Sequence, residues 1–165
     1  MTMNRDDQLH QAEILIEALP YIQRLSGKTV VIKYGGNAMQ DEKVIQTILE
    51  DVTLLKYVGM NPVVIHGGGP EINQMLEVQH IQSQFHKGLR ITDDATMDTV
   101  QMVLVGKVNT EIVSRLNGLG GKAVGLCGKD ANLIEVVKAP SKDGVDYGYV
   151  GQVSHINVEL LNMLT

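Results

Sequence analysis

Residues 29–37 read TVVIKYGGN and residues 61–70 read NPVVIHGGGP. In both stretches a run of β-branched residues, typical of a buried strand, leads directly into glycines, and a helical pattern follows. A strand, a glycine turn and a helix together aim backbone N–H groups and the positive end of a helix at one place, which attracts an anion. We therefore expect the two turns to hold phosphate or carboxylate groups of a small molecule.

The order of the surrounding patterns predicts an α/β fold. Strands are expected at 28–33, 62–66 and 122–126, and helices at 41–57, 70–76 and 93–116, with short strands possible within the irregular residues 78–92. Strands that alternate with helices imply a mainly parallel sheet covered on both faces. A hairpin of strands 133–137 and 149–153 and a helix over 157–164 complete the expected order.

A further helix is expected before the first strand, over residues 7–24. Its apolar residues have helical spacing, but Pro20 interrupts it, and a proline inside a helix predicts a kink near Ala18 or Leu19. This helix either packs on its own domain or is offered to another subunit.

Composition narrows the class of protein. The chain has 165 residues, of which 44% are hydrophobic and 20% charged, so it can form one globular domain with a core. A net charge of −5 argues against a nucleic-acid surface. The single cysteine, Cys127, cannot form an internal disulfide, and residues 1–8 do not resemble a secretory signal, so we expect a cytoplasmic protein.

Two kinds of site are not expected. The five histidines show no metal-ligand spacing, so no protein-bound metal is predicted. No stretch approaches the roughly 20 apolar residues of a membrane span.

Lys33 ends the first expected strand, at the edge where open α/β sheets bind ligands. Gly35 and Gly36 would let a phosphate approach backbone N–H groups with no Cβ in the way. A lysine there can follow a transferring phosphoryl group as a compact positive charge. The alternative is a solvated lysine followed by a simple bend.

The second turn contains three consecutive glycines, which include Gly68 and Gly69, and Pro70 then opens a helix. Three glycines cost conformational entropy on folding, so a merely connecting turn has little reason to use them. The alternative is a flexible connection. His66, at the end of the strand, is better explained as a packed histidine than as an acid–base group.

Arg90 stands in GLRIT, residues 88–92, just before the long helix with acidic residues at its start. Its planar guanidinium could bind a carboxylate with two charge-assisted hydrogen bonds, of roughly 1.5–3 kcal/mol. The alternative is an ordinary surface arginine.

Five motifs occur in a recognisable order: KYGGNAM (33–39), HGGGP (66–70), GLRIT (88–92), GLCGKD (125–130) and GYVGQV (148–153). Together they resemble the amino-acid kinase family, most closely its members that phosphorylate N-acetyl-L-glutamate. The resemblance implies a three-layer α/β/α sandwich with a mainly parallel sheet. It also implies transfer of the γ-phosphoryl group of ATP, bound with Mg²⁺, to the side-chain carboxylate of N-acetyl-L-glutamate in arginine biosynthesis.

The resemblance assigns roles residue by residue. It implies that Lys33 stabilises the transferring phosphoryl group and that Gly35 and Gly36 cradle phosphate. It implies that Gly68 and Gly69 contact the acceptor substrate, and that Arg90 holds the acceptor's α-carboxylate.

The resemblance also implies how the chain is organised. Residues 1–27 look like the extra helix of arginine-inhibited members, so we expect a homo-oligomer, a hexamer, with L-arginine as feedback inhibitor. Residues 28–165 match the lobe that binds the amino acid. The ATP-binding C-terminal half has no counterpart here, so we expect a truncated enzyme that lacks full kinase activity alone.

Two alternatives remain open. One is a kinase of the same fold that acts on another acceptor, such as carbamate or aspartate. The other is a non-catalytic ligand-binding or oligomerisation module.

Overall fold

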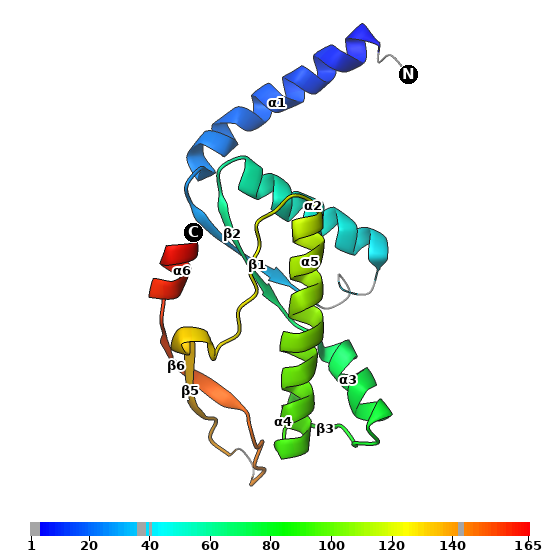
Figure 1. Ribbon diagram of the computed structural model, residues 1–165, viewed down its shortest axis with the longest axis vertical. Helices are drawn as coiled ribbons and strands as arrows, with labels where there is room; N and C mark the ends of the chain where they lie inside the picture. Colours follow the sequence, from blue (N-terminus) through cyan, green and yellow to red (C-terminus); the bar gives the residue numbers. More distant parts are fainter. Residues whose placement is uncertain (1–3, 36–38, 40, 142–143) are drawn as a thin grey trace.

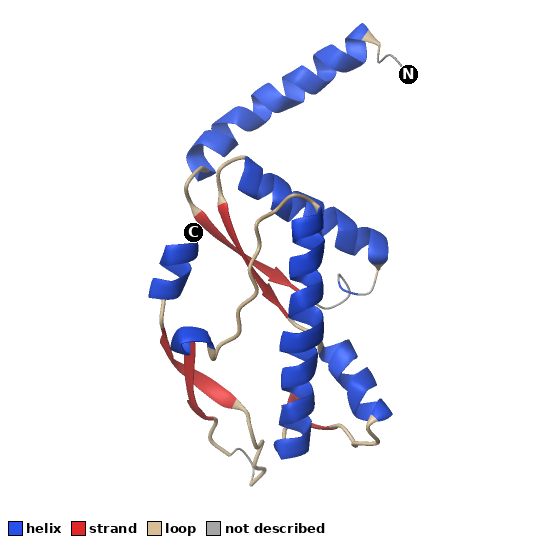
Figure 2. Ribbon diagram, viewed as in Figure 1, coloured by secondary structure: helices blue, strands red, loops and turns tan. Residues whose placement is uncertain are grey.

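The computed structural model describes residues 4–35, 39, 41–141 and 144–165. Its elements are α1 (Arg5–Leu25), β1 (Thr29–Tyr34), α2 (Glu42–Tyr57), β2 (Asn61–His66), α3 (Gly69–Val78), β3 (Gln84–His86), β4 (Leu89–Ile91), α4 (Asp94–Gln101), the π-helix η2 (Met102–Asn109), α5 (Thr110–Gly118), the 3₁₀ turn η3 (Asp130–Asn132), β5 (Ile134–Lys138), β6 (Gly151–Ile156) and α6 (Glu159–Leu164). Figures 1 and 2 show their arrangement. The predicted α/β class, with an N-terminal helix before a parallel pair of strands, is confirmed.

The strands among the described residues form three pairs. β1 and β2 are parallel, whereas β3–β4 and β5–β6 are antiparallel. The predicted hairpin is therefore confirmed as β5–β6, and the short strands expected within residues 78–92 are β3 and β4. Among the described helices none is long and apolar enough to cross a membrane.

The core lies on one face of β1–β2. Tyr34, at the end of β1, is 4% exposed and packs with side chains of α2, α3, η2 and α5. The buried members of this cluster are Tyr34, Leu49, Val52, Ile72, Leu76, Val103, Val108, Ile112 and Leu116. On the opposite face Val31 and Ile65 are 62% and 56% exposed. Helices thus bury one face of this parallel pair among the residues that the structure describes.

The predicted helix 93–116 is one long rod of three parts, α4, η2 and α5 (Figure 1). Its buried residues Thr99, Val103, Val108, Ile112 and Leu116 are spaced four, five, four and four apart. Four residues over-rotate an α-helix by about 40°. The wider π turn lies where the five-residue step occurs and keeps the buried line on one side.

Aspartate side chains cap the starts of α2 and α4. Asp41 caps α2, because its side chain accepts hydrogen bonds from the Lys43 and Val44 N–H groups at 2.8 and 3.3 Å. Asp93 caps α4 by accepting from the Thr96 N–H group at 2.9 Å. Hydrogen bonds from the Thr96 side chain and from its N–H group hold the pKa of the Asp93 carboxyl below its usual value.

The predicted strand 122–126 is wrong. Residues 121–127 have no regular structure and cross the molecule after α5 (Figure 2). Their backbone bonds instead to side-chain amides of the long helix. Asn117 accepts from the Ala123 N–H group at 2.8 Å and donates to its carbonyl at 3.2 Å, and Asn109 donates to the Leu126 carbonyl at 3.0 Å. Amide side chains have taken the place of a strand partner.

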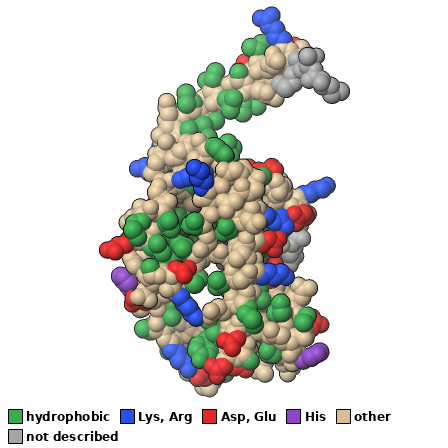
Figure 3. Space-filling model, in the orientation of Figure 1, with side chains coloured by type: hydrophobic (Ala, Val, Ile, Leu, Met, Phe, Trp, Pro, Cys, Tyr) green, Lys and Arg blue, Asp and Glu red, His purple; other side chains and the backbone are tan. Residues whose placement is uncertain are grey.

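Helix α1 projects away from the rest of the molecule (Figure 1) and has no buried residue. α1 is one helix from Arg5 to Leu25, with Pro20 inside it. Hydrophobic side chains line its surface (Figure 3), and Leu15 and Ile16 are each 68% exposed.

Candidate functional site

The two glycine turns lie side by side. The register of β1–β2 pairs Lys33 with Ile65 and Tyr34 with His66, so both strands end at the same edge. Directly beyond them the Gly67 N–H group donates to the Tyr34 carbonyl at 3.1 Å. A Cβ placed on Gly35 would stand 3.7 Å from the Gly67 nitrogen. The predicted convergence of the turns is therefore present in the backbone. Gly36 lies outside the described residues.

Lys33 is the last residue of β1 whose side chain belongs to the open face of the sheet. Its neighbour Tyr34 is buried in the core on the other face, whereas Lys33 is exposed. Lys33 and its strand partner Ile65 are each followed by the last residue of their strand, so the lysine stands one residue from the edge where the two glycine turns meet. His66, one residue on, has its Nδ1 2.9 Å from the Gly67 carbonyl oxygen.

The second turn is held against the π-helix. Gly68 is buried and stands at the N-cap of α3. A Cβ at Gly68 would lie 2.6 Å from Leu104 Cδ2 and 3.4 Å from Val108 Cγ2, both in η2. Such a Cβ at Gly69 would meet nothing within 4 Å. Gly68 is therefore required by close packing, and Gly69 leaves the first turn of α3 accessible.

Arg90 in β4 is held on α3. Its guanidinium donates to Asn73 Oδ1 at 2.7 Å and to Ser83 Oγ, and it stacks over the Phe85 ring with its Cζ 4.6 Å from the centroid. Burial lowers the pKa of Arg90 from its usual value. An arginine carries five N–H donors, so this fixed group keeps donors for a carboxylate.

Arg90 is thereby tied to the glycine turns. Asn73 lies about one helical turn after Gly69, at the start of α3. The structure brings together Lys33, Gly35, Gly68 and Gly69 at one edge, and connects Arg90 to them through α3. Arg90 is half-buried and hydrogen-bonded within the chain, and its role toward a carboxylate stays a prediction. The partners Asn73 and Ser83 gave no signal in the sequence, since neither stands in a motif.

A cavity of about 310 Å³ lies behind the turns, between α2, α3 and the long helix. It is lined by Tyr34, Glu42, Glu71, Lys107 and Arg115, among others. Arg115 bridges Glu42 and Glu111, with contacts of 3.2 and 2.9 Å from its Nη2, and its hydrogen bonds to Glu42 raise the pKa of Arg115. The sequence signal for this ion pair was the four-residue spacing of Glu111 and Arg115.

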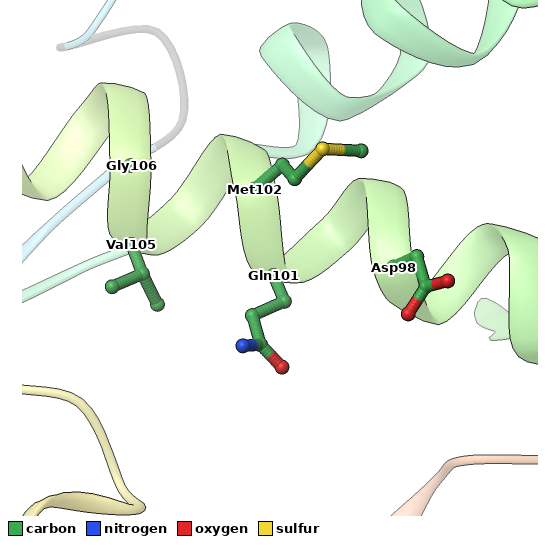
Figure 4. A pocket seen from close by; sticks show the side chains of 5 residues that line it. All are labelled: Asp98, Gln101, Met102, Val105 and Gly106. Carbon is green, nitrogen blue, oxygen red and sulfur yellow. The ribbon is translucent and has the colours of Figure 1, made fainter.

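A second cavity, of about 450 Å³, lies along the long helix, and in Figure 4 the side chains of Asp98, Gln101 and Val105 point to the same side of that helix. Its lining residues are Asp98, Gln101, Met102, Val105 and Gly106. It contains none of the predicted site residues. Within the described ranges there is no group of three or more acidic, histidine and cysteine side chains that could hold a metal ion.

A comparison with known sequences identifies the class. Residues 28–165 match the profile of the Amino acid kinase family, and the chain belongs to that family. A curated relative from Caldicellulosiruptor saccharolyticus, named acetylglutamate kinase, is 58% identical over 162 residues, covering 96% of this chain and 55% of the relative. The chain thus spans about half the length of the curated relatives that it matches.

Solved structures share the fold. The smu.665 protein of Streptococcus mutans UA159 superposes with a TM-score of 0.71 at 28% identity, covering 82% of this chain and 54% of that one. N-acetylglutamate synthase from Neisseria gonorrhoeae, solved with coenzyme A and L-arginine, gives a TM-score of 0.66 at 22% identity, covering 89% of this chain and 35% of that one.

Replacing Gly68 by alanine should destabilise the chain by about 1–3 kcal/mol, because the new Cβ is forced against Leu104. The φ of Gly68, 170°, lies outside the left-handed region that favours glycine, so we attribute the cost to the steric contact. Gly69→Ala, which meets open space, is the matched control and should change stability by less than about 0.5 kcal/mol. Urea denaturation measures both.

The same packing predicts coupling to Leu104. In a Leu104→Ala background the cost of Gly68→Ala should shrink by at least about 0.5 kcal/mol, because the obstructing methyl group is gone. Equal costs in the two backgrounds would show that Leu104 does not press on the turn.

Proposed function

We propose that this chain is the acceptor-binding part of a kinase that transfers the γ-phosphoryl group of ATP to the side-chain carboxylate of N-acetyl-L-glutamate. The observation that carries the proposal is the meeting of two glycine turns at one sheet edge, with Lys33 beside them. Arg90 is bonded to Asn73, which lies about one helical turn after Gly69 in α3. The name of the relatives at 52–58% identity, acetylglutamate kinase, supports the same reaction.

Each residue has a role that fits its position. Arg90 would hold the α-carboxylate with its remaining donors, and the turn at Gly68 and Gly69 would receive the acceptor at the positive end of α3. Lys33, with Gly35 and Gly36, would face the phosphates of ATP, which brings Mg²⁺ as part of the co-substrate. Phosphoryl transfer needs little covalent chemistry from the protein, so positioning and charge neutralisation carry it.

The proposal extends to assembly and control. α1 offers an apolar surface that the described residues of its own domain do not cover, which supports a hexameric enzyme joined through this helix. The Neisseria gonorrhoeae synthase of the same fold was solved with L-arginine, which supports L-arginine as a feedback inhibitor. We place the enzyme in the cytoplasm and in arginine biosynthesis.

The experiment uses a chimera of residues 1–165 with the remaining part of the Caldicellulosiruptor saccharolyticus relative. A coupled assay of ADP release should show turnover with N-acetyl-L-glutamate at least tenfold above that with carbamate or aspartate. Residues 1–165 alone, assayed in parallel, should not reach normal turnover. A preference for carbamate or aspartate would select the alternative kinase, and a chimera with no turnover on any acceptor would favour the non-catalytic module.

Lys33→Ala in this chimera should lower kcat by about 10²–10³, as when a single donor to a developing anion is removed. Lys28→Ala is the control, since Lys28 immediately precedes the other end of the same strand, and it should leave kcat within about twofold. An unchanged kcat in Lys33→Ala would contradict the proposed role of Lys33.

Arg90→Lys keeps the charge but loses the planar fork. The KM for N-acetyl-L-glutamate should rise by about 10- to 100-fold, which corresponds to the loss of a paired charge-assisted hydrogen bond, while the KM for ATP stays the same. Arg24→Lys, in α1, is the control. A rise of both KM values together would argue against a specific contact with the acceptor carboxylate.

A further inference from the structure

The strand that carries Arg90 is too short to hold itself in place. β3 and β4 have three residues each, and Phe85 and Leu89 on this hairpin are 56% and 43% exposed. A two-stranded hairpin of this size is at best marginally stable in water. The position of Arg90 must therefore depend on contacts beyond the hairpin.

Residues 147–149, which we call the clasp, supply such contacts from the connection between β5 and β6. The Thr92 N–H group donates to the Tyr147 carbonyl at 3.0 Å, and the Tyr149 N–H group donates to the Thr92 carbonyl at 2.8 Å. This pair of bonds makes an isolated parallel bridge between Thr92 and Gly148. Thr92 in turn donates from its Oγ1 to the Arg90 carbonyl at 3.1 Å. The clasp thus reaches Arg90 through one residue.

The clasp also touches the other strand of the hairpin. Tyr147 is 3% exposed, and its ring centroid lies 5.9 Å from that of His86 in β3. Thr92 itself is 6% exposed. The hairpin is therefore held at both strands: β3 contacts the buried Tyr147, and β4 is bonded through the buried Thr92.

Gly148 is the residue that allows the bridge. Its φ is +67°, and a Cβ there would overlap the carbonyl oxygen of Thr92. The Gly148 N–H group donates to Asp146 Oδ1 at 2.9 Å, while Asp146 Oδ2 accepts from Lys138 Nζ at 2.8 Å. The turn is thus connected to β5.

A last contact connects the clasp to the long helix. The Tyr149 hydroxyl donates to Asp94 Oδ1 at 2.7 Å, in the first turn of α4. In Figure 1 the connection between β5 and β6 reaches down to this end of the long helix. The clasp therefore joins β5, the start of α4 and the strand of Arg90.

From these contacts we propose that the clasp is a positioning element for acceptor binding, with Gly148 and Tyr147 as positioning residues that set the place of Arg90. The inference rests on the proposed function, since it gives the arginine a carboxylate to bind. A guanidinium displaced by about 1 Å loses the geometry of a paired carboxylate contact. Disturbing the clasp then weakens acceptor binding without touching ATP.

The test compares two glycines of the same connection in the chimera described above. Gly148 and Gly144 both have positive φ, +67° and +74°, but a Cβ at Gly144 meets nothing within 4 Å. Gly148→Ala should raise the KM for N-acetyl-L-glutamate at least tenfold, with kcat and the KM for ATP within twofold. Gly144→Ala, which carries the same backbone strain, should leave all three within twofold.

Two outcomes overturn the inference: an unchanged acceptor KM in Gly148→Ala, or an equal rise in Gly144→Ala. Should Gly148→Ala fail to fold, Thr92→Val removes only the hydroxyl that bonds to the Arg90 carbonyl. A rise of at least threefold in acceptor KM then supports the inference, and no rise overturns it. The proposed function is judged separately, by which acceptor the unaltered chimera phosphorylates.

Discussion

The parallel register of β1 and β2 is the constraint on which the site depends. It brings Tyr34 opposite His66 and allows the Gly67 N–H group to close the ladder on the Tyr34 carbonyl. A slip of one residue in β1 would exchange its faces, so Lys33 would enter the core and Tyr34 would leave it. Burying an unpaired ammonium group is costly, and this cost holds the register that joins the two turns.

Much of this arrangement could be predicted from local sequence. The β-branched runs before the glycines predicted β1 and β2, and the helix expected at 41–57 is α2. The end of α5 is formed by equally local residues: Gly120 has a φ of +87°, and the Gly121 N–H group donates to the Leu116 carbonyl. These features succeed because each depends on residues that are close in the chain.

The errors arose where distant residues compete. The strand expected at 122–126 has apolar residues of the right kind, but Asn109 and Asn117 satisfy its backbone first. The π turn in the long helix is visible only in which residues are buried, since Val103 and Val108 lie five apart. Likewise, nothing near Arg90 in the sequence indicated that Asn73 and Ser83 fix its guanidinium. The role of Gly36 stays a prediction.

The solvent-exposed face of the β1–β2 pair affects how the chain behaves in solution. Parallel strands are ordinarily shielded above and below, yet here Val31 and Ile65 meet water. Solvent-exposed apolar side chains of this kind favour self-association. When residues 1–165 are produced on their own, their self-association therefore rises with protein concentration. The solubility of the chain then reports whether another surface covers the exposed face of β1–β2.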